Sequence, residues 1–305
     1  MRKLTALLLL TGLTSLALLS AAPAALQRVE DRPLLPRPGL LKVLFKAQLG
    51  LVTDYFWILT LNRIGAAATP AEYRDVYYYA DLTTDLDPRF DKAYLFAGVT
   101  VPFHMGRGQY ANTSESTTLL RKGVAALPDH TRLRFQLAYN LMFFDRQYKE
   151  AGAIIEELSR LPGAPDWYPA LATRLYAAAG DFDTSMGLTL ALRDGAEDEE
   201  TRAYYDQRVQ EILQEQLLRQ VDEAIARYKA REGRLPTTVA ALVSAGELRE
   251  LPADPLGGQF FVGEDGRAYS SAAKFRLEVI QDEKDAQGER VLPKPVSKTH
   301  DETQP

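Results

Sequence analysis

Residues 128–192 read PDHTRLRFQLAYNLMFFDRQYKEAGAIIEELSRLPGAPDWYPALATRLYAAAGDFDTSMGLTLAL and decide the fold, because they repeat one helical pattern. Each copy starts with a proline, which the first turn of a helix tolerates because its N–H is not needed there. An apolar pair on a first helix is followed, 13 to 14 residues later, by a small residue on a second helix. These positions are Leu137-Ala138 with Ala151, and Leu171-Ala172 with Ser185. Units of about 34 residues that cannot bury both helix faces alone predict stacked helical hairpins.

Similar helix-start signals occur earlier in the chain. Residues 69–72, Thr-Pro-Ala-Glu, are typical of a capping box that opens a helix, and Asp87-Pro88 predicts another helix start. The spacing resembles the tetratricopeptide-repeat (TPR) family, with two well-matched units, two less complete ones and an inserted polar loop at residues 106–116. This resemblance implies a mainly α fold, a TPR-like helical-hairpin solenoid over residues 40–196.

A long helix is predicted after the hairpins, at residues 197–232, with Gly233 as its stop. Its apolar stripe consists of Tyr205, Val209, Ile212, Leu213, Leu217, Val221, Ala224 and Tyr228. We expect residues 197–233 to cap the solenoid and the charged outer face of this helix to be solvated.

Residues 234–280 predict a small α+β module. A short helix closed by Gly246 is followed by residues 251–271, LPADPLGGQFFVGEDGRAYSS, in which the Asp-Gly pair at 265–266 is a strong signal for an antiparallel hairpin. Alternation at Phe275, Leu277 and Val279 suggests a third strand.

The hairpin is expected to cover the long helix, because a small sheet is marginal without an apolar partner. The strand at residues 260–262 would then contact the helix at Leu217, Val221 and Tyr228. Residues 281–305 are poor in aliphatic side chains and are predicted to be a disordered tail.

Residues 228–271 resemble the C-terminal half of the major pseudopilins of type II secretion. The shared order is a helix, a Gly-Arg-Leu-Pro corner at 233–236, a short helix, Leu-Pro-Ala-Asp-Pro at 251–255 and a Gly-rich hairpin. That family binds calcium in a later acidic loop, which this chain does not match, so calcium is not expected here. No other cofactor or metal is expected either. The whole chain resembles exported TPR proteins of bacteria, a likeness that implies a fold and a compartment but no reaction.

The N-terminus predicts export. Arg2 and Lys3 precede an apolar run at residues 4–19, and small residues with the Ala-x-Ala pattern of signal-peptidase sites follow. Residues 4–26 are 23 uncharged residues, enough to span a bilayer, so residues 1–26 are a signal peptide or a membrane anchor. Residues 27–39 carry three prolines and predict a tether. We expect the body to be periplasmic or anchored to the outer face of the cytoplasmic membrane.

Residues 40–64 are apolar at most helix-facing positions and predict a buried helix, or two short ones. A membrane span is disfavoured here because charged side chains leave no uncharged stretch of sufficient length. These side chains are Lys42, Lys46, Asp54 and Arg63.

Charge and cysteine content exclude several functions. The net charge is −5 and no run of lysine or arginine occurs, which argues against a nucleic-acid partner. The absence of cysteine excludes disulfides, thiolate metal sites and a cysteine nucleophile.

Catalysis is not expected either. The three histidines, His104, His130 and His300, are far apart in sequence, and no hydrolase, metalloprotease or phosphate-loop motif occurs. His104 is the most site-like of them, but it is interpreted as a cap at a helix end. The carboxylates of Asp81, Asp85, Asp87 and Asp91 would suit a hard cation, although helix capping and solvation are favoured.

The aromatic residues are the better functional signal, because they outnumber what one helix face can bury, and tyrosine combines an apolar ring with a polar hydroxyl. Candidate partner-binding residues are Tyr78, Tyr94, Tyr139, Trp167 and Tyr168. The sequence therefore predicts a non-enzymatic exported scaffold that binds a protein or peptide partner in the cell envelope. Two alternatives stay open: a component of a type II secretion or type IV pilus machine that docks through its C-terminal module, and a hydrolase without familiar motifs.

Overall fold

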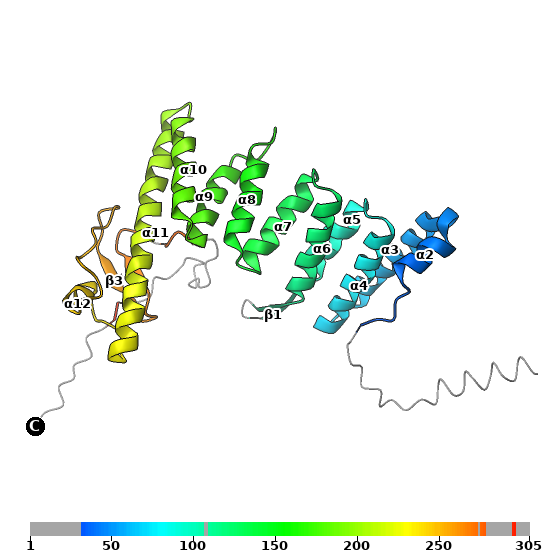
Figure 1. Cartoon of the computed structure of the whole chain (residues 1–305), viewed down its shortest axis with the longest axis horizontal. Helices are drawn as coiled ribbons and strands as arrows, with labels where there is room; N and C mark the ends of the chain where they lie inside the picture. The colour runs from blue at the N-terminus through cyan, green and yellow to red at the C-terminus, as the bar shows by residue number, and fades with distance from the viewer. Residues whose placement is uncertain (1–31, 107–108, 274, 279–294, 297–305) are drawn as a thin grey trace, which may run out of the picture.

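The computed structural model describes residues 32–106, 109–273, 275–278 and 295–296, and this part of the chain is mainly helical. The predicted signal or anchor segment and nearly all of the predicted disordered tail lie outside the described residues. The helices follow one another in a single elongated row, from α2 at one end to α11 and a small C-terminal module at the other (Figure 1).

The row is made of helices that pair with their neighbours in sequence. In chain order its elements are α2 (Pro38–Leu44), the 3₁₀ turn η1 (Lys46–Gln48), α3 (Leu49–Ala66), α4 (Pro70–Leu86), α5 (Asp91–Thr100), β1 (Phe103–Gly106), β2 (Gln109–Ala111), α6 (Thr113–Ala126), α7 (Thr131–Phe143), α8 (Tyr148–Ser159), α9 (Tyr168–Ala179), α10 (Phe182–Asp194) and α11 (Glu199–Glu232). The C-terminal module adds α12 (Val239–Ser244), β3 (Phe260–Val262) and β4 (Ala268–Ser270). The two helical hairpins predicted at residues 128–192 are therefore confirmed as α7–α8 and α9–α10.

Local signals set several helix ends. The Thr69 hydroxyl accepts from the Glu72 N–H at 3.4 Å, and the Glu72 carboxylate accepts from the Thr69 N–H at 3.0 Å, so the capping box is confirmed. Asp87-Pro88 does not open α5, which begins at Asp91. Instead the Asp87 carboxylate accepts from the Arg89 N–H at 2.9 Å and closes a turn before the helix.

One apolar core runs through α4 to α9, and it is tightest between α5 and α6. Tyr94 of α5 is fully buried, and a Cβ added at Gly123 of α6 would lie 2.7 Å from its ring. A Cβ at Gly98 would lie 2.6 Å from the Leu120 side chain. These glycines let the two helices approach closely, and the Tyr94 ring fills the space beside them.

Replacing Gly123 with alanine is expected to lower the free energy of unfolding by about 1–3 kcal/mol, because the added methyl group overpacks the contact with Tyr94. The matched control is Gly187→Ala in α10, where an added Cβ meets no described atom within 4 Å. That control is expected to stabilise by up to about 1 kcal/mol through helix propensity. Urea denaturation of both variants measures the difference, and effects of equal sign would contradict the tight α5–α6 contact.

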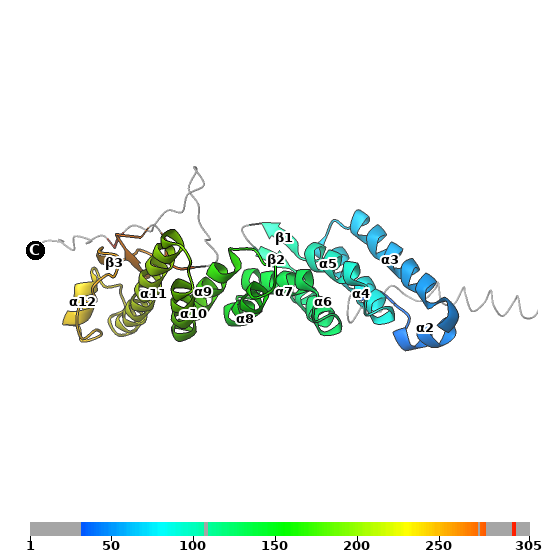
Figure 2. The same cartoon turned by 90° about the horizontal axis from the view of Figure 1, so that it is seen from above.

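A β-hairpin formed by β1 and β2 takes the place of much of the polar loop predicted at residues 106–116. Strands β1 and β2 pair antiparallel, with Phe103 opposite Ala111 and His104 opposite Tyr110, and α6 already begins at Thr113. His104 therefore lies in a strand and does not cap a helix. Seen from above, this hairpin lies on the same side of the row as α3 (Figure 2).

Helix α3 is more exposed than predicted. Its buried residues are Thr53, Phe56 and Thr60, which face α4, whereas Leu51, Tyr55, Ile58 and Leu61 are exposed. The expectation of a buried helix, or two short ones, at residues 40–64 is met by two helices, α2 and α3, but it was wrong about their burial, because α4 and the short α2 leave much of the α3 surface uncovered. No helix in the described part of the chain is both long enough and apolar enough to cross a membrane.

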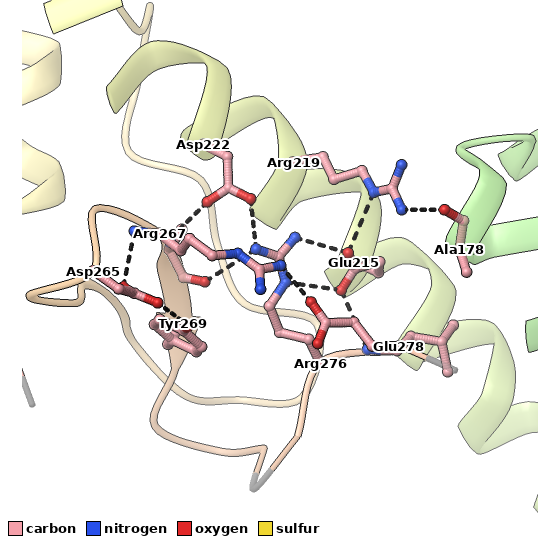
Figure 3. A network of polar contacts seen from close by, with 11 residues as sticks. Ala178, Glu215, Arg219, Asp222, Asp265, Arg267, Tyr269, Arg276 and Glu278 are labelled. Carbon is pink, nitrogen blue, oxygen red and sulfur yellow. Dashed lines mark hydrogen bonds and ion pairs between the residues drawn. The ribbon is translucent and has the colours of Figure 1, made fainter. Parts of the chain in front are cut away.

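The predicted long helix is confirmed as α11, which ends at Gly233 in the left-handed conformation, with φ 71°. Its apolar stripe was predicted only in part, since Leu213 is 36% exposed while the charged Glu215 is buried. The reason is a buried ion pair between Glu215 and Arg276 of the C-terminal segment (Figure 3).

The C-terminal module covers one end of α11 with a two-stranded sheet. Strands β3 and β4 pair antiparallel around a turn in which Gly266 has φ 80°. Val262 and Phe260 join Val221 and Tyr228 in one apolar cluster, as predicted, although Leu218 takes the place expected for Leu217. The third strand predicted at Phe275, Leu277 and Val279 is not found within the described residues: Arg276 and Leu277 are both buried, so the expected alternation fails, and Val279 is not described.

Two residues of the predicted disordered tail are ordered. Pro295 pairs with Gly263, and the Val296 N–H donates to the Val262 carbonyl at 2.9 Å, which extends the edge of β3. The prediction of disorder throughout residues 281–305 was therefore wrong at these two positions, because the open edge of a short sheet offers hydrogen-bond partners that composition does not reveal.

Candidate functional site

Helix α7 presents three aromatic rings at intervals of four residues. This spacing places Phe135, Tyr139 and Phe143 along one face of the helix. The Tyr139 and Phe143 rings stack, with centroids 5.4 Å apart and an interplanar angle of 11°. All three side chains are partly exposed, whereas Leu133, Leu137 and Leu141 of the same helix are buried in the core.

Rings from neighbouring elements extend this row in both directions. Tyr168 of α9 stacks on Phe135 at 5.5 Å, and Trp167 meets the same ring edge-on at 5.9 Å. At the other end, Tyr110 of β2 contacts Phe143 at 5.7 Å and Phe144 at 5.0 Å, measured between centroids. His104 of β1 lies 5.0 Å from Tyr110.

We call this surface the aromatic face; it comprises His104, Tyr110, Phe135, Tyr139, Phe143, Phe144, Trp167 and Tyr168. Part of this surface is accessible to a partner, since Trp167 is 52% exposed. Met105, which follows His104 in β1, is exposed as well. Helices α4, α6, α8 and α10, which alternate with α5, α7 and α9 along the row, differ from this surface. None of their described large apolar side chains is exposed. Between α3 and α10, the exposed large apolar side chains thus lie on α3, α5 and β1 and in the segment that joins α8 to α9.

The structure brings together three of the five predicted site residues: Tyr139, Trp167 and Tyr168 all lie on the aromatic face. Tyr78 lies apart on α4, where its ring contacts Tyr77 at 5.2 Å and the Arg32 guanidinium at 5.3 Å. Tyr94 is 0% exposed, so its prediction as a partner-binding residue was wrong. Its ring occupies the gap that the small Gly123 leaves between α5 and α6.

Several members of the aromatic face were missed by sequence reasoning. Phe135 shares the four-residue spacing of Tyr139 and Phe143, which was a signal available in the sequence. His104 and Tyr110 could not be placed in the same way, because the hairpin that brings them to α7 was taken for a loop.

The polar atoms of the aromatic face suit recognition. Tyrosine hydroxyls are neutral near pH 7 and can donate or accept a hydrogen bond, and partial burial raises the pKa of Tyr139 and Tyr168 further. Rings with an apolar body and a neutral hydroxyl can bind an apolar side chain and a peptide group together. This arrangement provides binding surface and no evident nucleophile.

The four aspartates considered for a cation have protein partners. Lys122 of α6 places its Nζ 2.7 Å from a carboxylate oxygen of Asp81 and 2.7 Å from one of Asp85, both on α4. Asp91 lies 3.1 Å from Nε2 of His130, whose Nδ1 accepts from the Leu133 N–H and caps α7. Within the described residues no group of three metal-ligating side chains is found.

Comparisons of the chain with protein-family models, with curated proteins and with solved structures found no match. Function is therefore inferred from the geometry of the chain itself.

Proposed function

We propose that this chain is a non-enzymatic, exported scaffold that binds a protein or peptide partner at the aromatic face, in envelope assembly or secretion. The observation that carries the proposal is the set of partly exposed rings along α7, which contact one another from Tyr110 to Tyr139 and from Phe135 to Trp167. Aromatic residues are enriched at the centres of protein interfaces, where they supply large contact areas at a low entropic cost.

A TPR-like solenoid is the architecture that we propose for residues 40–196. Its support is the repeat spacing of residues 128–192 together with the row of paired helices (Figure 1). In such an array each hairpin contacts only its neighbours, which leaves one long surface free for an extended peptide or a partner helix. The N-terminal apolar run at residues 4–19 supports export, to the periplasm or to the outer face of the cytoplasmic membrane.

The alternative, docking through the C-terminal module in a secretion or pilus machine, has less support. The inner side of the hairpin is already occupied by α11, since Val262 and Ala268 are buried in the cluster that contains Val221. A module fastened in this way serves better as a cap than as a free docking element.

Replacing Tyr139 and Trp167 together by alanine is expected to weaken partner binding by at least about 100-fold, because truncation of each central aromatic residue costs about 2 kcal/mol. The measurement is photo-crosslinking in cells from a reactive residue placed at Phe143. A discrete adduct should form with the parent chain and disappear in the double variant.

Tyr55→Ala is the matched control, since Tyr55 is an exposed aromatic residue on α3 whose ring packs against Phe56 of the same helix. It is expected to leave the adduct intact, and the thermal midpoints of all variants should agree. An adduct that survives the double variant, or that is lost equally in the control, would argue against the aromatic face as the binding surface.

A further inference from the structure

The N-terminal end of the row exposes an unusual amount of apolar surface. Most large apolar side chains of the segment from α2 to the first turn of α3 are exposed, among which Val43 is 78% and Leu51 is 71% exposed, although Leu41 is buried. We call this surface the N-terminal patch; it comprises Leu40, Val43, Leu44, Phe45 and Leu51. Isolated exposed leucines are ordinary, but a contiguous apolar patch marks an interaction site.

Positive charge surrounds the N-terminal patch. Arg37, Lys42 and Lys46 are all exposed and lie in the same short segment. Between residues 32 and 71 the only carboxylate side chain is that of Asp54. This local excess of cations contrasts with the net charge of −5 of the whole chain. Apolar side chains flanked by lysine and arginine match the boundary between acyl chains and anionic headgroups.

The patch also lies close, along the chain, to the segment predicted as a signal or anchor. Residue 26, the last of the uncharged stretch, precedes Pro38, the first residue of α2, by twelve residues, which span at most about 40 Å when extended. A chain held in a bilayer by residues 4–26 would thus keep α2 within reach of the same bilayer.

We propose that the N-terminal patch lies on the surface of an anionic phospholipid bilayer. Leu40, Val43, Leu44, Phe45 and Leu51 enter the boundary between headgroups and acyl chains, and the neighbouring cations contact lipid phosphates. The argument that α2 lies within reach of a bilayer rests on the proposed anchoring by residues 4–26, whereas the arguments from apolar exposure and from charge do not. The patch is an interfacial element and not a span, since α2 has 7 residues.

A second copy of the chain fits this surface less well. A twofold symmetric contact brings the same patch of both copies together, which would place Arg37, Lys42 and Lys46 of one copy near those of the other. An anionic lipid surface, in contrast, neutralises these cations.

The absence of cysteine permits a direct test in the full-length chain. Leu51→Cys is labelled with an environment-sensitive fluorophore, and the protein is reconstituted into phosphatidylcholine vesicles with one quarter phosphatidylglycerol. The matched control is Leu161→Cys, since Leu161 is an exposed leucine in the loop between α8 and α9. Lipids brominated on their acyl chains are expected to quench the label at position 51 several-fold more than the label at position 161.

Reversing the charge of two lysines is the second test of the proposal. Lys42→Glu with Lys46→Glu is expected to reduce the quenching at position 51 at least twofold, and high salt should act in the same direction. Equal quenching at positions 51 and 161 would overturn the proposal. A label that is shielded from water without being quenched by the lipids would also overturn it, in favour of a protein occupant.

The outcome separates this proposal from that of membrane anchoring. If the chain stays with the vesicles while position 51 is not quenched, the N-terminal patch is not a lipid surface and residues 4–26 alone hold the chain. If the parent chain does not associate with vesicles at all, both the anchor and the patch are refuted. Circular dichroism of each variant verifies that the helices are retained.

Discussion

Replacing Glu215 with alanine is expected to lower the free energy of unfolding by about 3–5 kcal/mol, because it removes one of the two carboxylates that neutralise the buried Arg276 guanidinium. Glu215 is 2% exposed and Arg276 is 3% exposed. The Glu215 carboxylate accepts from Arg276 at 3.1 Å and 2.7 Å, and from the Leu277 N–H at 3.2 Å (Figure 3). One substitution thus removes three of the hydrogen bonds that hold the C-terminal segment against α11.

The charged state of Arg276 depends on its partners. Burial disfavours the guanidinium cation, but Glu215 and Asp222 outweigh this effect and raise its pKa above the ordinary value. Since α11 contributes both carboxylates, and since Arg219 joins Glu215 to the Ala178 carbonyl at the end of α9, the network links three parts of the chain.

Two controls test this explanation by urea denaturation. The double variant Glu215→Leu with Arg276→Met is expected to recover most of the lost stability, because apolar side chains of similar size often replace a buried ion pair without loss. Glu232→Ala removes an ion pair with Arg231 in which both side chains are exposed, and we expect a much smaller change, because solvent screens such a pair. A loss for Glu215→Ala no larger than for Glu232→Ala would contradict a buried, stabilising pair.

Deleting residues 235–305 is expected to lower the thermal midpoint of the remaining helices. The deletion uncovers Leu218, Val221, Ala224 and Ile225 of α11, which are buried in the intact chain. At about 25 cal/mol per Å² of apolar area, exposing a few hundred Å² costs several kcal/mol. That amount is a large share of the stability of a typical domain.

The control for this deletion is a chain that ends after Val296, which keeps both described residues of the tail. Its midpoint is expected to match that of the full chain, as followed by circular dichroism at 222 nm. If deletion of residues 235–305 leaves the helical midpoint unchanged and instead abolishes partner crosslinking, the module is an independent docking element and the cap assignment is wrong.

Features that depend on residues close in sequence could be predicted from the sequence. The capping box of Thr69 and Glu72 forms because both groups lie within one helical turn. The end of α11 at Gly233 follows from the left-handed conformation that glycine adopts without a Cβ penalty. Likewise, the alternation of apolar and turn residues between 128 and 192 was sufficient to place α7 to α10.

Part of the candidate site was also predictable. Tyr139, Trp167 and Tyr168 stood out as aromatic residues beyond the needs of one helix face, and they do lie together. The burial of Tyr94 was not predictable, because it depends on Gly123, 29 positions later in the chain, leaving room for its ring.

Tertiary structure alone decided the remaining features. Glu215 and Arg276 read as solvated surface charges, and only the return of the C-terminal segment to α11 buries them as a pair. The apolar residues of α3 read as core, and several of them are exposed because the short α2 at the end of the row leaves part of this helix uncovered. The sequence by itself thus determined the helices and their ends, through contacts within a few residues. Which side chains are buried depends on contacts between distant segments, and no local pattern encodes those.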